Sequence, residues 1–168
     1  IVHGNKMLSN VINKLMQDNS GIVVSATEPV KDRKRVWMQK GKNLINLLNC
    51  NISNNSSTHK VNSNSIEVSS NGGWAFSQIE NYTVNKGKEY TLSANYNNNA
   101  NINNGIIVYD SNGGTINYQT SSEMMGRFEI TFVPSTEKIK IKFAVNNTPD
   151  NNTNTVNYTN VQLEQASS

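Results

Sequence analysis

The strongest constraint on the fold of this chain is a run of alternating side chains between residues 128 and 145. Apolar residues occupy every second position on both sides of Pro134, first at Phe128, Ile130 and Phe132, then at Ile139, Ile141, Phe143 and Val145. Successive side chains of a β-strand point to opposite faces, so each stretch predicts a strand with one apolar face. Pro134 and the polar residues after it are typical of a turn, and we expect the two strands to form a hairpin. A lone hairpin is unstable in water, so the rest of the chain must supply the sheet on which it packs.

The chain from residue 43 onward repeats this pattern in short segments separated by turn residues. Strands are expected at 43–49, 65–69, 73–78, 82–84, 89–96, 105–110, 115–120 and 156–164. We expect a polar loop from the first strand to about residue 64, and tight hairpin turns at 71–73 and 111–114. Short strands at this spacing are typical of a β-sandwich or barrel, so the predicted fold class is all-β.

The first 42 residues follow a different pattern. Apolar residues recur at three- and four-residue steps between Met7 and Leu15, which predicts a helix that ends near Gly21. The apolar stripe of a helix this short needs a cover, either its own domain or a parallel coiled coil between identical chains, and we favour the coiled coil. A short strand is expected at 21–25. We assign residues 1–42 to oligomerisation and attachment, and 43–168 to the main domain.

The segment 31–42 holds six of the chain's 15 Lys and Arg residues and a single acid, Asp32. A nucleic-acid site would need further aromatic or basic groups, but the segment has one aromatic residue, Trp37, and no second basic patch follows. We expect a solvated edge strand or a subunit contact here. The sequence contains no signal peptide and no membrane-spanning run, so we expect a soluble protein without nucleic-acid or membrane partners.

The composition is polar, but it is not typical of a disordered chain. Hydrophobic residues make up 35% and charged residues 16%, and asparagine, which favours turns over helix interiors, is the commonest residue. The regular alternation and the small net charge of +3 indicate a folded domain. The single cysteine, Cys50, excludes an internal disulfide and a Cys-based zinc cluster, and we expect a buried structural thiol.

Catalytic motifs are missing from the sequence. Its two histidines, His3 and His59, lie in unrelated segments, and it has no Gly-X-Ser-X-Gly elbow or phosphate-binding loop. The acids that a glycosidase needs in pairs are scattered over different strands and turns, at Glu67, Glu80, Glu89, Asp110, Glu123 and Glu129. We therefore predict that the chain is not an enzyme.

Several landmarks, taken in order, resemble those of a known family. They are an Asn-Leu-Leu-like opening strand, Gly-Gly-Trp at 72–74, KGKEYTLSANY at 86–96, GRFEITFVP at 126–134, IKIKFAV at 139–145 and YTNVQLEQ at 158–165. Over about residues 43–165 the chain resembles jelly-roll carbohydrate-binding modules. The segment at 21–43 resembles the one that precedes such modules in tail and baseplate proteins of phages and phage-tail-like particles of Gram-positive hosts.

This resemblance implies a jelly-roll β-sandwich in a receptor-binding subunit of a virion tail or phage-tail-like particle. Such a subunit is a homotrimer that contacts other tail or baseplate proteins and grips a cell-wall polysaccharide at the outer face of a Gram-positive cell. Two alternatives stay open: a structural baseplate or fibre module that makes only protein contacts, and a binding module appended to a glycan-degrading enzyme.

The resemblance also bears on metal binding. Many members carry two acids before the final Val-X-Leu-Glu, where they help to hold a structural calcium ion, but this chain has Thr159 and Asn160 there. Calcium prefers carboxylate and carbonyl oxygens, so the loss of both charges weakens such a site. We predict no cofactor and no metal ligands, with a structural calcium ion as the less favoured alternative.

Aromatic residues beside turns are the candidates for a saccharide site, because the apolar faces of pyranose rings stack on aromatic rings. Trp74 follows Gly72 and Gly73, although a place in the core beside Phe76 is an equal alternative. Tyr109 and Tyr118 flank the turn at 111–114, one on each strand of the expected hairpin. For them, ordinary strand propensity is the competing explanation.

Other polar and aromatic residues have less specific signals. Tyr90 and Tyr96 share a strand face with Leu92, so we expect them in the core. Asn95 and Gln119 are predicted to orient the hydroxyl groups of a bound saccharide, although amide side chains are common throughout this chain. The predicted site is therefore Trp74, Tyr109, Tyr118, Asn95 and Gln119.

Overall fold

A computed structural model of the chain describes residues 42–70, 72–146 and 153–166. The predicted N-terminal helix, the strand at 21–25 and all of the basic segment except Lys42 lie outside these residues. The described elements are η1 (Leu47–Asn49), β1 (Ile52–Asn55), β2 (Ser57–Val61), β3 (Ile66–Ser70), β4 (Trp74–Thr83), β5 (Tyr90–Asn98), β6 (Asn104–Asp110), β7 (Thr115–Ser121), β8 (Met125–Phe132), β9 (Lys138–Asn146) and β10 (Thr155–Gln165). Among the described residues, no helix is long and apolar enough to span a membrane.

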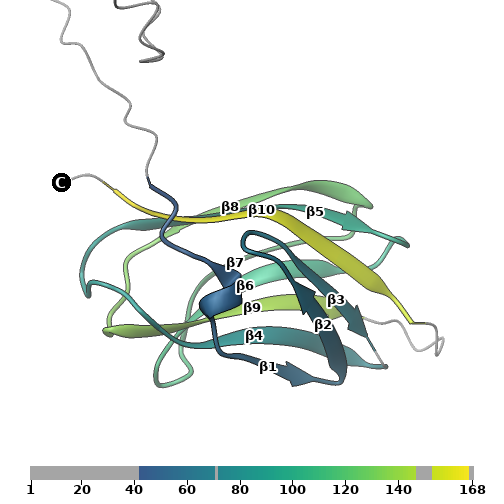
Figure 1. Cartoon of the computed structure of the whole chain (residues 1–168), viewed down its shortest axis with the longest axis horizontal. Coiled ribbons are helices and arrows are strands. Elements are labelled where there is room, and N and C mark those ends of the chain that lie inside the picture. Colours follow the sequence, from purple (N-terminus) through teal and green to yellow (C-terminus); the bar gives the residue numbers. More distant parts are fainter. Residues whose placement is uncertain (1–41, 71, 147–152, 167–168) are drawn as a thin grey trace, which may run out of the picture. The chain divides into compact units, whose positions relative to one another are not determined.

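The strands form two antiparallel five-stranded sheets that lie one on the other (Figure 1). Sheet A has the order β1-β4-β9-β6-β7, and sheet B has the order β2-β3-β10-β5-β8. Strands that follow one another in the chain often belong to different sheets, as in a jelly roll. The predicted all-β class and the jelly-roll β-sandwich are both confirmed.

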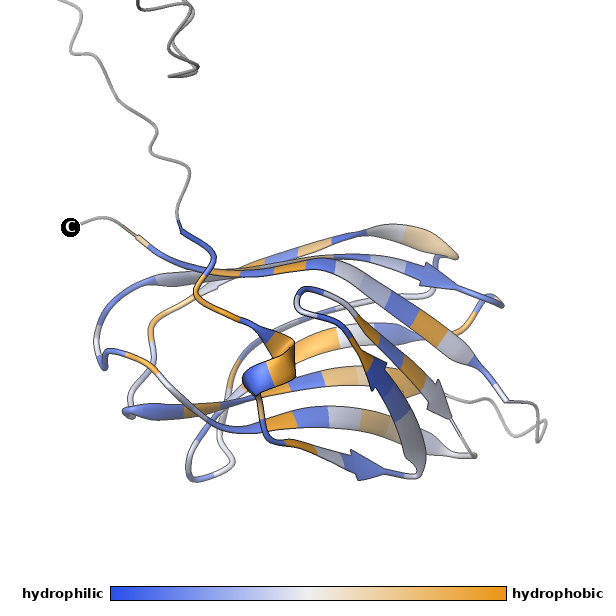
Figure 2. Ribbon diagram, in the orientation of Figure 1, coloured by the Kyte–Doolittle hydropathy of each residue, from blue (hydrophilic) through white to orange (hydrophobic). Residues whose placement is uncertain are grey.

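The alternation in the sequence buries one face of each sheet. Figure 2 shows hydrophobic and hydrophilic residues alternating along the strands. The inward residues of both sheets form one core, with Ile66, Val68, Leu92, Ile106, Ile141, Phe143 and Leu163 fully buried. Tyr90 and Tyr96 are 2% and 6% exposed, which confirms their predicted place in the core.

Tyr158 of β10 joins the two sheets through the core. Its side chain is fully buried, and its hydroxyl donates to the carbonyl oxygen of Ala144 in β9 at 2.6 Å. The same hydroxyl accepts from the amide of Gly105 in β6 at 3.1 Å. Burial raises the pKa of Tyr158, so the neutral phenol that makes these two hydrogen bonds persists at ordinary pH.

The hairpin predicted between residues 128 and 145 is wrong, although both of its strands exist. β8 pairs with β5 in sheet B, whereas β9 lies between β4 and β6 in sheet A. Each strand has one apolar face, and placing the two strands on opposite sides of the core buries both faces at once. The turn at Pro134 therefore crosses from one sheet to the other.

The hairpin predicted at the turn 71–73 is wrong for the same reason. β3 pairs with β2 and β10 in sheet B, and β4 pairs with β1 and β9 in sheet A. Gly72 and Gly73 have φ angles of 130° and 64°, which a residue without a side chain adopts readily. They turn the chain across the edge of the sandwich. The hairpin predicted around 111–114 is confirmed, because β6 pairs with β7.

The strand predicted at 43–49 is also wrong. The Asn43 side chain accepts from the amides of Ile45 and Leu163, and the Asn46 side chain accepts from the amide of Leu48 as the cap of η1. These side chains supply partners that a strand would have taken from a neighbouring backbone. The polar loop predicted after this segment contains β1 and β2 instead, two strands of sheet edges with little apolar alternation.

The remaining predicted strands correspond to β3, β5, β6, β7, β8, β9 and β10. The two strands predicted at 73–78 and 82–84 are a single long strand, β4, whose pairing with β9 shifts between Ile79 and Tyr82. Asn81 lies in this irregular stretch with a φ of 55°. A bulge of this kind continues the strand while changing the direction of its side chains.

Candidate functional site

Two aromatic residues of β4 lie on the outer surface of sheet A. Ala75 and Ile79 of this strand are 0% and 1% exposed and point into the core. Because side chains alternate along a strand, Trp74 and Phe76 point to the opposite side. The alternative that Trp74 belongs to the core is therefore wrong, and half of its surface is exposed.

Two further aromatic residues reach the same surface from β6 and β7. Val108 of β6 is fully buried, so its neighbour Tyr109 points outward. Tyr118 of β7 pairs with Ile107, and directly paired residues of an antiparallel sheet share a face. Tyr118 is 61% exposed. We call the outward side of sheet A with these four residues the aromatic face: Trp74, Phe76, Tyr109 and Tyr118.

Lys142 of the central strand β9 lies between the two less exposed rings of the aromatic face. Its Nζ atom is 3.9 Å from the centroid of the Phe76 ring and 4.6 Å from that of Tyr109. It also donates to the Tyr109 hydroxyl at 3.2 Å. A cation over the face of an aromatic ring is attracted by the ring's negative charge density. Lys142 therefore fixes Phe76 and Tyr109, and leaves Trp74 and Tyr118 as the exposed rings.

The row of paired residues across the middle of this face has small residues at its two central positions. Phe76 of β4 pairs with Ala144 of β9, which pairs with Gly105 of β6, and Gly105 pairs with Thr120 of β7. A Cβ atom on Gly105 would lie 2.7 Å from the carbonyl oxygen of Gln119 and 2.8 Å from Thr120 Cγ2. The close pairing of β6 with β7, and hence the place of Tyr118, depends on glycine at this position.

Glu80 carries the negative charge of the aromatic face, near the bulge of β4. Its Oε1 atom accepts from Ser53 at 2.7 Å and from Gln78 at 2.6 Å, and its Oε2 lies 3.5 Å from Lys140 Nζ. Partial burial raises the pKa of this carboxyl group, but the hydrogen bonds from Ser53 and Gln78 and the charge of Lys140 outweigh it and lower the pKa overall. Glu80 is ionised at neutral pH and neutralises Lys140.

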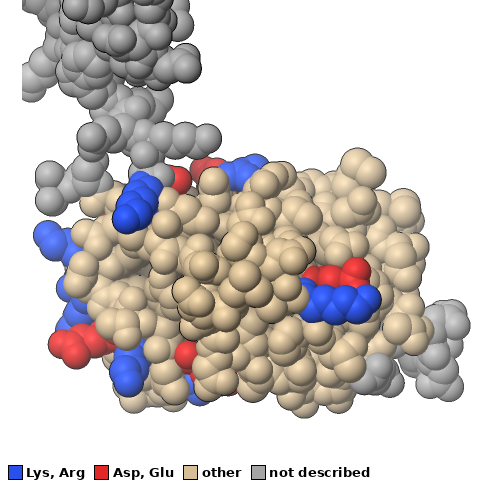
Figure 3. Space-filling model, viewed as in Figure 1, with Lys and Arg blue, Asp and Glu red and all other residues tan. Residues whose placement is uncertain are grey.

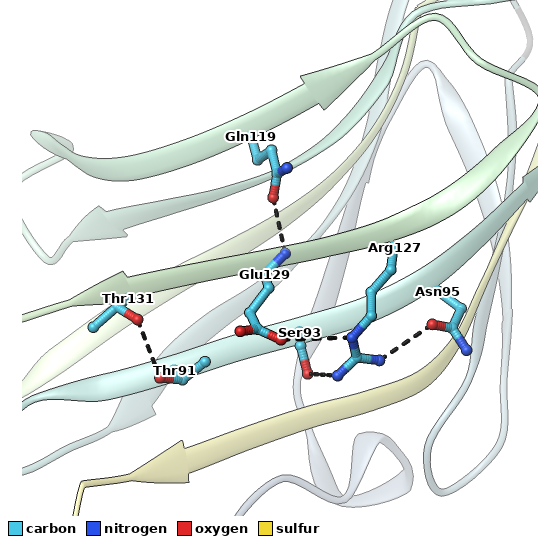
Figure 4. A network of polar contacts seen from close by, with 7 residues as sticks. All are labelled: Thr91, Ser93, Asn95, Gln119, Arg127, Glu129 and Thr131. Carbon is cyan, nitrogen blue, oxygen red and sulfur yellow. Dashed lines mark hydrogen bonds and ion pairs between the residues drawn. The ribbon is translucent and has the colours of Figure 1, made fainter.

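Asn95 and Gln119 do not lie on the aromatic face. Asn95 is on the outer surface of sheet B, where its Oδ1 accepts from Arg127 at 3.1 Å (Figure 4). Gln119 lies on β7 with the parity opposite to Tyr118, and its Oε1 accepts from the amide of Glu129 in β8 at 2.8 Å. The side-chain amide of Asn117 donates to the carbonyl oxygen of Thr131, also in β8. The side-chain amides of Gln119 and Asn117 therefore bond to backbone groups of β8, the edge strand of sheet B. The sequence contained no signal for these contacts.

Around Arg127, the side chains on the outer surface of sheet B are polar and bond to one another. Figure 4 shows Arg127 of β8 beside its partners, which are Glu129 on the same strand and Ser93 and Asn95 on the neighbouring strand β5. Its guanidinium donates to Ser93 Oγ at 2.8 Å and lies 3.6 Å from Glu129 Oε2. Thr91 and Thr131 share a hydrogen bond of 3.2 Å across β5 and β8.

The sequence analysis did not assign Phe76 of the aromatic face, or Lys142 beside it, to the site. Phe76 shares a strand face with Trp74, and that shared parity was the available signal once Trp74 proved to be exposed. Lys142 belongs to an alternating Lys-Ile-Lys-Ile-Lys run at 138–142. Its importance depends on the pairing of β9 between β4 and β6, which is not visible in the sequence.

Metal ligands are not gathered in the part of the chain that the structure describes. No three His, Cys, Asp or Glu side chains there are close enough to hold a metal ion. Thr159 and Asn160 lie where β10 shifts its pairing with β5, and Asn160 has a φ of 50°. Their neutral side chains do not make the oxygen donor set that calcium prefers, so the residues present do not fit the structural calcium site of the resembled family.

A pocket of about 550 Å³ lies beside η1 and the end of β4. Its lining includes Leu44, Cys50, Glu80 and Tyr82. The Tyr82 hydroxyl donates to the Leu44 carbonyl at 2.7 Å. Burial raises the pKa of Cys50, so its thiol stays protonated, and it is partly rather than fully buried as the sequence led us to expect.

Solved structures similar to this fold are carbohydrate-binding modules and an enzyme that carries such a fold. The N-terminal cellulose-binding domain of Cellulomonas fimi β-1,4-glucanase C matches with a TM-score of 0.53 and 14% identity, over 70% of this chain and 90% of that chain. A family 29 carbohydrate-binding module complexed with mannohexaose matches with a TM-score of 0.51 and 12% identity, over 74% and 87% of the two chains. An exo-β-agarase matches with a TM-score of 0.53 and 10% identity, over 75% of this chain but 26% of the agarase.

No family model matches the chain, and no curated protein matches it in sequence. At identities this low, the structural matches show that the fold is shared. They agree with the jelly-roll sandwich described above.

Proposed function

We propose that this chain binds a saccharide, without catalysing a reaction, on the aromatic face of sheet A. The observation that carries the proposal is the exposure of two large rings on one sheet surface, Trp74 at 50% and Tyr118 at 61%. Between them lie the small residues Ala144 and Gly105, both buried. Exposed rings offer flat apolar surfaces to the C–H faces of pyranoses.

Polar groups beside the rings supply the directional part of such a site. The side chains of Gln78 and Thr120 share the outward parity of the aromatic face. Hydroxyls and amides can each donate and accept hydrogen bonds, as sugar hydroxyls can. These residues take the role that the sequence analysis gave to Asn95 and Gln119, which lie elsewhere.

The similar structures favour this class of ligand over a protein contact. One is named a cellulose-binding domain, and another is complexed with mannohexaose. The agarase, in which the matching fold is about a quarter of the chain, favours a second candidate role, that of a binding module attached to a glycan-degrading enzyme.

The setting that we propose for the whole protein is the tail or baseplate of a phage or phage-tail-like particle. There the domain would act as a homotrimeric receptor-binding subunit on the wall polysaccharide of a Gram-positive cell. The support for this setting is the resemblance of the segment at 21–43 and the helical pattern before it. Sedimentation of the full chain tests the trimer directly: a monomer at micromolar concentration would contradict it.

A binding assay on a broad set of purified polysaccharides and Gram-positive cell walls tests the saccharide proposal. We expect the native chain to be retained by at least one of them, and Trp74→Ala and Tyr118→Ala each to weaken that retention while thermal unfolding is unchanged. Met125→Ala is the matched control, because it removes an exposed apolar side chain, 70% exposed, from a strand of sheet B. If no polysaccharide or wall retains the native chain, the proposal is wrong and the structural-module alternative takes its place.

A further inference from the structure

The central strand of sheet A carries a row of positive charge on its outward side. β9 lies between β4 and β6, and its residues Ile139, Ile141 and Phe143 are fully buried. The alternating residues Lys138, Lys140 and Lys142 therefore point away from the core. Figure 3 shows that, on the side of the described residues visible there, charged side chains lie in separate small groups rather than in one continuous patch.

Two of these lysines differ in how their charge is balanced. Lys140 lies 3.5 Å from Glu80, whose ionised form is held by Ser53 and Gln78. The three ion pairs found among the described residues are Lys60–Glu67, Arg127–Glu129 and Lys140–Glu80, and none includes Lys142. Within that part of the chain, Lys142 is a cation without a carboxylate partner.

Lys142 is nevertheless held in place. Lys60, by contrast, has a side chain that is 85% exposed, and it pairs with the carboxylate of Glu67 at 3.0 Å. The Lys142 ammonium instead lies over the Phe76 ring at 3.9 Å and bonds to the Tyr109 hydroxyl at 3.2 Å. An ammonium has three N–H donors, and this contact uses one. The side chain therefore presents a fixed charge with remaining donors.

The position of Lys142 places this charge within the proposed saccharide site. It pairs with Gln78 on one side and with Ile107 on the other, and Ile107 pairs with Tyr118. Trp74 lies on the neighbouring strand β4, next to Phe76 along the same face. A saccharide stacked on both exposed rings would therefore pass close to the ammonium.

We propose that the aromatic face selects saccharides that carry negative charge, and that Lys142 binds the anionic group. This inference rests on the saccharide-binding function proposed above and names its ligand class. Carboxylates of uronic acids and phosphate groups of phosphorylated glycans share the required chemistry, since each offers charged oxygen acceptors to an ammonium. Phe76 and Tyr109 hold the lysine, and Trp74 and Tyr118 supply the stacking surfaces.

Binding of matched charged and neutral polymers tests the inference. The charged arms are polygalacturonate and a glycerol-phosphate polymer bearing sugar substituents, and the neutral arms are carboxyl-reduced polygalacturonate and a set of neutral glucans, mannans and galactans. We expect at least one charged polymer to bind about tenfold or more tightly than any neutral polymer, with affinity that falls as salt is added. The charged polymer that binds distinguishes the carboxylate from the phosphate.

Three variants assign the effect to Lys142. Lys142→Gln should remove the preference for charged polymers, and Lys142→Arg should keep most of it. Lys60→Gln, which changes the net charge equally but lies on sheet B, should leave the preference intact. Thermal unfolding of each variant checks that the fold persists.

Two results would overturn the inference. Neutral polymers that bind as tightly as charged ones would show that the face binds saccharides without selecting charge, and the proposed function would stand. An equal loss of preference in Lys142→Gln and Lys60→Gln would assign it to net charge instead. If no polymer of either kind binds, both the inference and the proposed function fail.

Discussion

The outer surfaces of the two sheets come from the same alternating pattern but differ in how their side chains are satisfied. On sheet B, Arg127 has three side-chain partners on its own surface: Ser93, Asn95 and Glu129. On sheet A, Trp74 and Tyr118 expose half or more of their surface. The polar side chains around Arg127 already bond to one another, while the exposed rings of sheet A offer contact area to something else. Single exposed apolar side chains are ordinary on a protein surface, whereas several aromatic rings gathered on one surface mark a binding site.

The edge where the two sheets meet extends this contrast. β7 belongs to sheet A, yet the side chains of Asn117 and Gln119 bond to the backbone of β8 in sheet B. Unpaired strand edges invite pairing with other chains, and these amides occupy part of that edge. One strand thus serves both purposes: its inward parity closes the sandwich, and its outward parity places Tyr118 on the aromatic face.

Among the substitutions that test the difference between the two surfaces, Gly105→Ala should have the largest effect on stability. It changes sheet A alone. The new Cβ would meet the Gln119 carbonyl at 2.7 Å, and a backbone atom cannot move away without shifting β7. Overpacking of this kind costs about 1 to 3 kcal/mol in free energy of unfolding. Chemical denaturation measures this loss, and saccharide binding should weaken with it because Tyr118 moves. A variant as stable as the native protein would show that β6 and β7 are not held as closely as the structure indicates.

Tyr158→Phe is expected to lower stability by about 1 to 2 kcal/mol, because it leaves the Gly105 amide and the Ala144 carbonyl without this partner in the core. The substitution leaves both outer surfaces unchanged and removes only hydrogen bonds in the core between the two sheets. Val161→Ala, a truncation of another buried side chain of β10, is the control for simple loss of packing. If Tyr158→Phe unfolds at the same denaturant concentration as the native protein, the two hydrogen bonds of this hydroxyl make no net contribution to stability.

The sequence was sufficient for most strands because alternation is a local signal. It located β5, β6 and β10 closely, since each buries one full face. It failed for β1 and β2, which lie at sheet edges and have polar residues on both sides. It also failed for every partner choice that required knowing which sheet a strand joins, as at Pro134.

The residues of the candidate site also divide into those that local position predicted and those that depend on strand pairing. Position near a turn was enough to select Trp74, which begins β4, and Tyr109 and Tyr118, which lie on the two strands joined by the turn at 111–114. Asn95 and Gln119 were assigned by residue type, and only the pairing of β5 and β7 shows that they bond elsewhere. Lys142 was missed because its partners, Phe76 and Tyr109, come from strands that are distant in the sequence.

Glu80 should make the stability of the folded protein modestly dependent on pH in the acid range. Its pKa is lower in the folded protein than in the unfolded chain, so its contribution to stability is present above the unfolded pKa and is lost as pH falls through the folded value. The effect should stay below about 1 kcal/mol, because the ion pair with Lys140 is partly solvated. Thermal unfolding of the native protein and Glu80→Gln across the acid range measures it. If the stability difference between the two proteins is independent of pH, the hydrogen bonds from Ser53 and Gln78 do not favour the ionised carboxyl group.

The smallest effect is expected on the sheet B surface, from Arg127→Ala. The Arg127 side chain is 43% and its partner Glu129 63% exposed, so the ion pair is screened by water and is worth less than about 1 kcal/mol. Ser93 and Asn95 can exchange the lost guanidinium for solvent. Chemical denaturation should therefore show a small change, and saccharide binding should show none because the substitution lies on the opposite sheet. Weakened binding in this variant would mean that the polar surface of sheet B takes part in recognition. The assignment of saccharide binding to the aromatic face of sheet A alone would then be wrong.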